Sequence, residues 1–248
     1  TDVEEEKIKV PSKVKNHVFI RELVFYKISN LELDLYNLEH AHVTKATFYR
    51  LYLEDFLHMD EHITYLDCDV ICLKNPLSAL NEVSNELKNS NKIVSFNTEI
   101  LRGEGYSYFK DLSLMGDKYF NAGVMVFNAS KWAKFDVKNK ALKLIPKIQE
   151  KAIFWDQDIL NIIFDNNFLE LPDVLNSRLR EKKSDTIFHH FSGKFKPWSI
   201  NGVHQAFSEN FHNHYKEIYS GSYLINVPNF KNGKKHLFKK IKDKEITN

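Results

Sequence analysis

Short apolar runs alternate with stretches of helical periodicity along most of this chain. Four runs are rich in β-branched or aromatic residues, and each predicts a strand: Ile63–Leu66, Lys92–Phe96, Gly123–Phe127 and Thr186–Phe191. Three stretches repeat apolar residues at helical spacing and predict helices: Ala41–Leu57, Asn139–Glu150 and Gln157–Phe164. A further apolar run, Leu23–Tyr26, predicts another strand. Because strands and helices alternate, we expect an α/β sandwich with a mostly parallel central sheet.

Composition and charge divide the chain into a globular body and a basic tail. Of the 248 residues, 43% are hydrophobic and 27% charged, and no apolar run reaches the 18 residues of a membrane span. After Tyr223 there are seven lysines and only two acidic residues, Asp243 and Glu245. The rest of the chain is therefore slightly acidic, although the whole chain has a net charge of +2. We expect one main domain over residues 1–220 and a basic tail over 221–248. The body lacks the charge of a nucleic-acid-binding surface.

The two cysteines indicate the cellular compartment, and the first residue bears on whether the native polypeptide is longer. Cys68 and Cys72 would lie about 13 Å apart on one extended strand, too far to form a disulfide. We therefore expect reduced thiols and a cytoplasmic protein. The sequence begins at Thr1 with neither an initiator Met nor a signal-peptide pattern. We expect the native polypeptide to extend upstream and to supply a first strand.

The first candidate motif is Asp67-Cys68-Asp69, which follows the predicted strand Ile63–Leu66. Residues i and i+2 of a strand point to the same face, so the two carboxylates are expected to converge. Hard oxygen ligands of this kind suit a divalent cation, which can also carry a diphosphate. Alone the motif is weak, because acidic pairs are also common in solvated loops.

The second motif spans His189 to Trp198 and follows the strand Thr186–Phe191. The imidazole of His190 can complete a metal shell, Gly193 lets the backbone approach an oxygen, and the Lys196 ammonium neutralises negative charge. His190 is favoured over His189 because of its spacing to the glycine and lysine. Each residue taken alone also fits a core histidine or a solvated lysine.

Two further motifs combine polar residues with apolar runs. Asp156-Gln157-Asp158 precedes a helical pattern, which is also typical of a plain helix cap. Phe120-Asn121-Ala122-Gly123 leads into a strand, where small residues either admit a ligand or simply form a turn.

In this order the motifs resemble glycosyltransferase family 8, particularly its bacterial lipopolysaccharide α-galactosyl- and α-glucosyltransferases. The resemblance covers about Val43 to Trp198 and implies a Rossmann-like nucleotide-sugar-binding fold of the GT-A type. The matching strings are Thr47–Leu51, Tyr65–Val70, Phe120–Val124, Asp156–Asn161 and His190–Trp198, of which the last is the most specific.

The resemblance implies a role for each matching residue. Asp67, Asp69 and His190 would hold Mn²⁺ (or Mg²⁺), which bridges the two phosphates of a UDP-sugar. Gly193 and Lys196 would grip the diphosphate. The other residues implied in donor binding are Arg50, Cys68, Asn121, Ala122, Asp156 and Gln157.

The resemblance also implies transfer of a hexose, galactose or glucose, with retention of anomeric configuration. Asp156, Gln157 and Lys196 would be the catalytic residues. Because an amide is a poor nucleophile, we favour front-face attack over a covalent intermediate on Gln157. One departure is that nothing before Val43 matches the family's uridine-binding segment.

The sequence leaves two other functions open. It also gives expectations about the acceptor of the sugar and about attachment to a membrane. The chain could be a non-catalytic nucleotide-sugar or carbohydrate-binding module of the same fold, or a metal-dependent phosphohydrolase. We expect the acceptor, a lipid-linked saccharide such as lipopolysaccharide or lipooligosaccharide, to contact the irregular stretch Thr98–Asp117. A helix presenting Leu237, Phe238 and Ile241 on one face would attach the lysine-rich tail to an anionic membrane surface.

Overall fold

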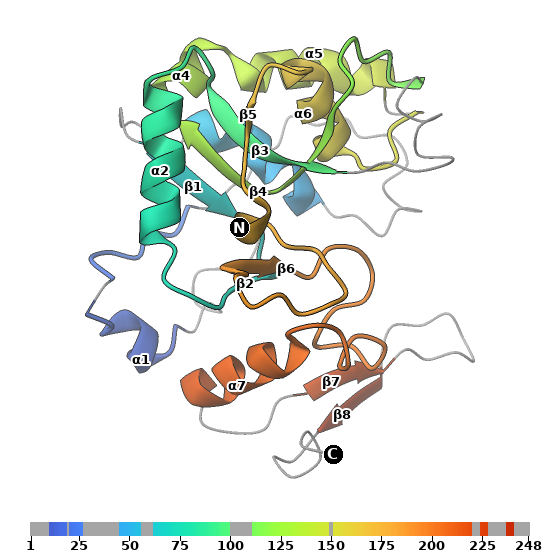
Figure 1. The fold of residues 1–248 in the computed structure, drawn as a ribbon. Helices are drawn as coiled ribbons and strands as arrows, with labels where there is room; N and C mark the ends of the chain where they lie inside the picture. The colour runs from blue at the N-terminus through green and yellow to red at the C-terminus, as the bar shows by residue number, and fades with distance from the viewer. Residues whose placement is uncertain are drawn as a thin grey trace. The chain divides into compact units, whose positions relative to one another are not determined.

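The described residues form two compact units with interleaved segments (Figure 1). The computed structural model describes residues 10–18, 20–26, 45–55, 62–99, 111–148, 151–219, 224–227 and 237–240. The first unit contains the described residues of Phe25–Leu66 and Leu77–Pro172. The second contains those of Ile8–Val24, Asp67–Pro76 and Asp173–Asn248.

The first unit is built on a four-stranded sheet in the order β1-β4-β3-β5. Its strands are β1 (His62–Leu66), β3 (Val94–Glu99), β4 (Tyr119–Asn128) and β5 (Leu169–Glu170). β1 and β3 are both antiparallel to β4, and β5 is parallel to β3. The predicted α/β class is confirmed. Three of the four strands point the same way, but the parallel pairing we expected is wrong for β1–β4 and β3–β4. Neighbouring strands that run antiparallel need no helical crossover between them.

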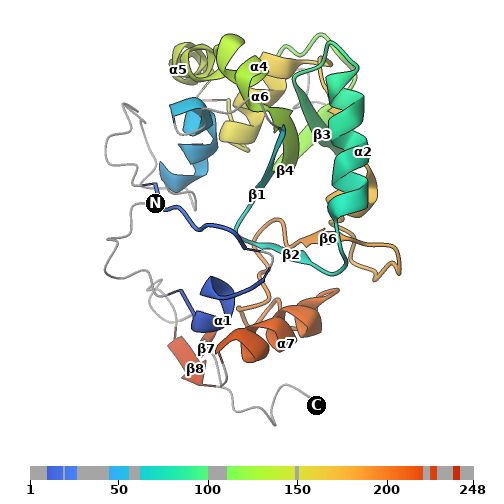
Figure 2. The same cartoon turned by 90° about the vertical axis from the view of Figure 1, so that its left-hand side faces the viewer.

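Helices flank this sheet on both sides. They are the 3-10 helix η3 (Lys45–Asp55) and the α-helices α2 (Leu77–Lys88), α4 (Ala129–Lys134), α5 (Val137–Ile148) and α6 (Asp156–Phe164). In Figure 2, α2 lies on one side of β3 and β4, and the other four lie on the opposite side. The core is aromatic: the rings of Phe96 and Phe120 stack with centroids 3.7 Å apart, and Trp132 and Phe164 are fully buried. Nine of the ten residues of β4 are buried, so this strand is the centre of the unit.

Most predicted elements of the first unit are confirmed with shifted ends. The predicted strands at Ile63–Leu66, Lys92–Phe96 and Gly123–Phe127 are β1, β3 and β4, and the two later helices are α5 and α6. The helix predicted from Ala41 is a 3-10 helix over its described part, and it buries Phe48 and Leu51 at a spacing of three. The strand predicted at Leu23–Tyr26 is wrong. These side chains are exposed, and their backbone pairs with no strand among the described residues.

The second unit has smaller elements. They are α1 (Ser12–Lys15), β2 (Val70–Cys72), the 3-10 helix η4 (Asp173–Leu175), β6 (Phe188–His190), α7 (Ser208–Tyr219), β7 (Leu224–Val227) and β8 (Leu237–Lys240). β2 pairs with β6 and β7 with β8, both antiparallel. The strand predicted at Thr186–Phe191 is β6. Phe191, Ala206 and Phe207 form a small core beneath it.

The helix predicted for the basic tail is wrong where the tail is described. Leu237–Lys240 is strand β8, whose pairing with β7 holds the backbone extended. An extended backbone does not repeat residues at the helical spacing on which the predicted apolar face depended. Ile241 lies outside the described residues. Within the part of the chain that the structure describes, no helix is long and apolar enough to cross a membrane.

Candidate active site

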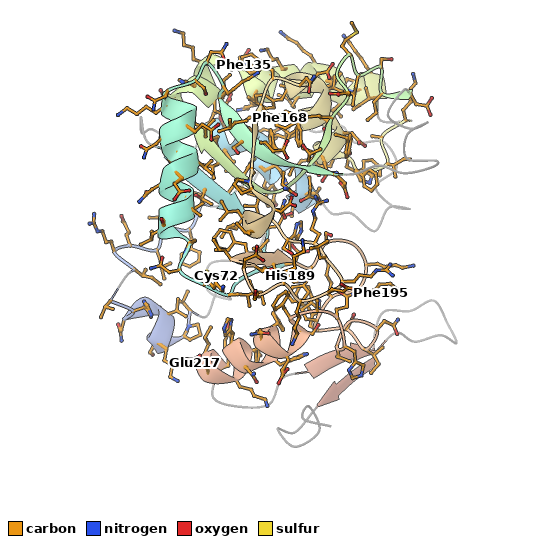
Figure 3. The ribbon with its side chains drawn as sticks, in the orientation of Figure 1. Cys72, Phe135, Phe168, His189, Phe195 and Glu217 are labelled. Atoms are coloured by element: carbon orange, nitrogen blue, oxygen red, sulfur yellow. The ribbon has the colours of Figure 1, made fainter. Side chains whose placement is uncertain are left out.

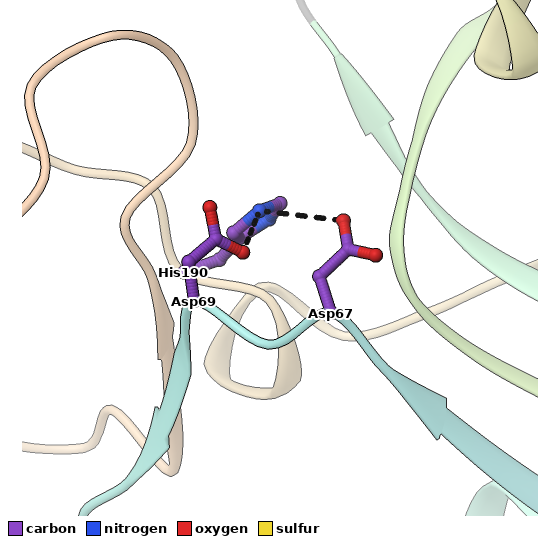
Figure 4. A group of neighbouring side chains, drawn as sticks. All are labelled: Asp67, Asp69 and His190. Atoms are coloured by element: carbon purple, nitrogen blue, oxygen red, sulfur yellow. Dashed lines mark ion pairs between the residues drawn. The ribbon is translucent and has the colours of Figure 1, made fainter. Parts of the chain in front are cut away.

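Two carboxylates and an imidazole converge in the second unit (Figure 4). Asp67 and Asp69 lie in the turn that leads into β2, and the N–H of Val70 closes this turn on the carbonyl of Asp67 at 3.1 Å. His190 belongs to β6. Its Nε2 is 3.3 Å from an Asp69 oxygen and 3.8 Å from an Asp67 oxygen. One ligand atom from each residue lies within 4.8 Å of the others, a spacing that a single metal ion can bridge.

The two carboxylates converge for a different reason from the one we predicted. The preceding strand β1 is only half-buried, and Leu66 is exposed. Because the Asp-Cys-Asp segment is a turn, strand alternation does not set its side-chain directions. Cys68 is exposed and outside the group, and both cysteines are free thiols.

Backbone pairing fixes the position of His190. Val70 lies opposite His190 in the β2–β6 ladder, and the N–H of Phe191 donates to the carbonyl of Asp69 at 3.0 Å. The buried Asn176 places its side-chain oxygen 3.2 Å from Nδ1 of His190. If Nδ1 carries a proton and donates to this oxygen, Nε2 is the ring nitrogen that faces the two carboxylates, where it can hydrogen-bond to Asp69 or ligate a cation in place of its hydrogen. Anchoring one ring nitrogen in this way is typical of metal-ligating histidines, so the residues present fit a divalent cation.

Lys196 joins the same group. Its ammonium forms an ion pair with Asp69 and donates to the carbonyl of Phe191 at 2.7 Å. Burial alone would raise the pKa of Asp69, but hydrogen bonding to His190 and the charges of His190 and Lys196 outweigh it and hold this pKa at about 2. Asp69 is therefore a carboxylate at neutral pH, as a metal ligand must be.

Two glycines shape the loop around Lys196. Gly193 has a φ of +82°, a conformation that favours glycine, although a Cβ there would meet no neighbouring atom. A Cβ on Gly202 would instead overlap the backbone of Lys196. The carbonyl of Lys196 also accepts hydrogen bonds from the N–H and hydroxyl of Ser199 at 2.9 and 2.7 Å.

The neighbouring His189 faces the core and is outside the metal-binding group. Its ring, labelled in Figure 3, packs against those of two phenylalanines. The centroid distances are 4.7 Å to Phe191 and 4.9 Å to Phe207. Burial, with a smaller effect of His190, lowers the pKa of His189 to about 4. Both histidines are buried, at 3% and 4% exposure, but only His190 faces the two carboxylates.

A second polar group lies in the first unit. Arg50 of η3 and Asp156, the first residue of α6, are both buried, and Nε lies 2.7 Å from a carboxylate oxygen. Arg50 also donates to the carbonyl of Ala122 at 2.5 Å, and its guanidinium carbon lies 5.0 Å from the centre of the Tyr65 ring.

An irregularity in β4 opens the backbone beside this ion pair. Pairing with β3 jumps from Met125 to Asn121, so within these two strands Ala122, Gly123 and Val124 have no partner across the ladder. The N–H of Ala122 donates instead to the side-chain oxygen of Gln157 at 3.2 Å. Bulges of this kind often lie beside active sites.

Apart from Cys68, the structure thus gathers the sequence-predicted residues into two groups, each within its own unit. Sequence analysis missed four residues that support these groups: Asn176, Glu99, Tyr119 and Gly202. Nothing in the local pattern marks Asn176 as the partner of His190. Glu99 and Tyr119, which bind Gln157, lie in β3 and β4 beyond the ends of the predicted strands. Gly202 could have been noticed, because Ser-Ile-Asn-Gly after Pro-Trp is a turn signal.

Comparison with known sequences agrees with this arrangement. The profile described as "Glycosyl transferase family 8" matches residues 2–202. The chain belongs to this family. Among curated relatives, a lipopolysaccharide 1,2-glucosyltransferase of Escherichia coli is 30% identical to this chain over 209 residues. The alignment covers 77% of this chain and 59% of that enzyme. It is 28% identical over 214 residues to general stress protein A of Bacillus subtilis, over 75% of this chain and 71% of the relative. The chain thus spans little more than half of the Escherichia coli enzyme.

Solved structures show the same fold. The galactosyltransferase LgtC, in complex with donor and acceptor sugar analogs, superposes with a TM-score of 0.60 at 21% identity, over 71% of this chain and 68% of that one. This likeness confirms the predicted GT-A fold of family 8.

Proposed function

We propose that this chain is a retaining glycosyltransferase that transfers a hexose, galactose or glucose, from a UDP-sugar to a saccharide acceptor. Family membership and the named activity of the Escherichia coli relative support this class of reaction. The observation that carries the proposal is the convergence of Asp67, Asp69 and His190, with Nδ1 of His190 beside Asn176.

Asp67, Asp69 and His190 would hold Mn²⁺ or Mg²⁺. When bound, the ion supplies Lewis-acid stabilisation of the donor's two phosphates. Asp69 is suited to this role because its low pKa keeps it ionised. Asn176 orients the imidazole, so we assign it a supporting part at the same site.

Lys196 would stabilise the departing UDP. Its ammonium is within hydrogen-bond reach of Asp69 and of the Phe191 carbonyl, and its side chain is one-quarter exposed. A diphosphate can therefore reach it from solvent. Negative charge on the leaving oxygen grows toward the transition state, where a fixed cation contributes most. Gly193 would let the loop backbone approach the same phosphates.

Arg50, Asn121, Ala122, Asp156 and Gln157 would line the donor-sugar site. The Gln157 oxygen already accepts two hydrogen bonds, from Asn121 Nδ2 at 3.0 Å and from the N–H of Ala122 at 3.2 Å. With both lone pairs engaged, this amide is a poorer nucleophile still, which favours front-face attack.

In that reaction the acceptor hydroxyl attacks C1 of the sugar from the face that UDP leaves. The bond from C1 to the UDP oxygen breaks, the bond from C1 to the acceptor oxygen forms, and the acceptor's proton passes to the departing diphosphate. The configuration at C1 is thereby retained.

We also propose that the acceptor is lipid-linked, of the lipopolysaccharide or lipooligosaccharide kind, and that the enzyme works on the cytoplasmic face of a membrane. Only the charge of residues 231–248 now argues for attachment, because β8 replaces the predicted apolar helix face. Each lysine near an anionic surface contributes about 1 kcal/mol, screened by salt. Co-sedimentation with anionic and neutral vesicles, with and without residues 231–248, tests this. Equal binding by both proteins would refute it.

A donor panel tests the main proposal. The protein would be incubated with Mn²⁺, each of several UDP-hexoses and a set of saccharide acceptors, and the product anomer assigned by NMR. We expect an α-linked product from UDP-galactose or UDP-glucose. Donor binding without turnover would instead indicate a non-catalytic module, and cleavage of simple phosphoesters a phosphohydrolase.

A further inference from the structure

The side-chain amide of Gln157 is held by four hydrogen bonds within the first unit. Its oxygen accepts from Asn121 Nδ2 and the N–H of Ala122. Its nitrogen donates to the hydroxyl of Tyr119 at 3.1 Å and to a Glu99 oxygen at 3.3 Å. An amide has two donor hydrogens and two acceptor lone pairs, so these four contacts use its whole capacity.

Groups with only one possible role determine which way this amide points. The backbone N–H of Ala122 can only donate, so the atom facing it must be the oxygen. Asn121 must present its NH₂ to Gln157, because its own oxygen accepts from the backbone N–H of Gly123 at 3.0 Å. A carboxylate such as Glu99 only accepts, and it therefore faces the nitrogen.

Asp158 determines the role of the Tyr119 hydroxyl. The Asp158 carboxylate is fully buried and accepts from Tyr119 Oη at 2.5 Å and from the N–H of Phe154 at 2.7 Å. Because Tyr119 gives its hydrogen to Asp158, its oxygen can only accept from Gln157. A rotated amide would place donor against donor at Ala122 and oxygen against oxygen at Tyr119.

We propose that Tyr119 and Asp158 are positioning residues for the transfer reaction, which lock the Gln157 amide with its oxygen toward Asn121 and Ala122. This rests on the proposed role of Gln157 in the donor-sugar site. Neither residue needs to touch the donor: Tyr119 is 1% exposed and Asp158 is fully buried. Their effect on the reaction passes through Gln157.

Tyr119→Phe tests the lock, because it removes one oxygen and keeps the buried ring. We expect kcat to fall about 10- to 100-fold, the range that a misplaced group can cost, with a smaller change in donor KM. The matched control is Tyr52→Phe, which removes a hydroxyl from another buried tyrosine of the same unit. It should leave turnover within about 2-fold of the wild type, because Tyr52 lies outside both polar groups.

A double-mutant cycle with Gln157→Ala separates positioning from a general structural effect. If Tyr119 acts through Gln157, then Tyr119→Phe should lower kcat no further in the Gln157→Ala background. If the two substitutions together lower kcat by the product of their separate factors, the proposal is overturned.

A second measurement needs no turnover. The side-chain NH₂ signals of Gln157 in a ¹⁵N–¹H spectrum are assigned by their loss in Gln157→Ala. Tyr119→Phe should shift them and speed their hydrogen exchange, and Tyr52→Phe should not. Unmoved signals in Tyr119→Phe would refute the lock. If the wild type turns over no UDP-sugar, the proposed function fails, and the spectrum alone then decides whether the lock exists.

Discussion

The buried ion pair between Arg50 and Asp156 gives a sharp prediction on stability. Replacing Arg50 with Met keeps much of the side-chain volume and removes the cation that faces the buried Asp156 carboxylate. At 2.7 Å and an effective dielectric constant of about 20, the pair attracts with about 6 kcal/mol, part of which desolvation offsets. Removing one partner of such a pair costs about 3–5 kcal/mol.

We therefore expect Arg50→Met to lower the free energy of unfolding by about 4 kcal/mol, a large part of a typical total. Urea denaturation followed by circular dichroism measures this. The double variant Arg50→Met/Asp156→Leu should recover most of the loss, because it leaves no buried charge unpaired. The control is Lys118→Met, which breaks an ion pair with Glu170 that is about half-exposed and should cost about 1 kcal/mol or less.

A double variant whose loss equals the sum of both single losses would refute this reasoning. So would an Arg50→Met protein no less stable than Lys118→Met. Either result would mean that the two charges remain solvated in the folded protein.

Three further predictions follow from the second unit. Lys196→Ala should lower kcat more than it raises donor KM, because leaving-group charge grows toward the transition state; a raised KM at unchanged kcat in steady-state assays would show that Lys196 only binds. Gly202→Ala should lower unfolding stability by about 1–3 kcal/mol and weaken UDP binding in calorimetry, because the new methyl group overlaps the backbone of Lys196; unchanged UDP affinity would show that this turn does not place the lysine. Burial, and secondarily Lys216, lowers the pKa of His212 to about 4. The unfolded chain therefore binds this proton near pH 6.5 and the folded chain does not, so stability is lost as pH falls from about 6.5 to 4. Urea midpoints measured across that range should fall less in His212→Leu, and parallel curves would contradict this.

The elements that could be predicted from sequence are those with strong periodicity. α5 and α6 repeat apolar residues at helical spacing, and the apolar run of β4 marks the strand that becomes the centre of the sheet. Strand direction could not be predicted, because it depends on connections that carry no periodic signal. At Leu23–Tyr26 we predicted a strand that is absent, and in the tail we predicted a helix where Leu237–Lys240 is a strand. Apolar residues alone do not decide between strand, helix and loop, because the pairing partners decide.

The candidate site was predicted better in residue identity than in geometry. Asp67, Asp69 and His190 do converge, but the carboxylates lie in a turn instead of on a strand face. The supporting residues escaped prediction because their contacts span the chain: Asn176 reaches His190 across 14 residues, and Tyr119 reaches Gln157 across 38. Only the fold brings such residues together.

Release of UDP from UDP-galactose and UDP-glucose, in Mn²⁺ and in excess chelator, tests the central claim most directly. Asp69→Asn belongs in the same assay, since it keeps the side-chain shape and removes the charge. We predict release that requires the metal, returns when Mn²⁺ is restored, and is lost in Asp69→Asn. Equal release in excess chelator, or full activity of Asp69→Asn, would contradict the account.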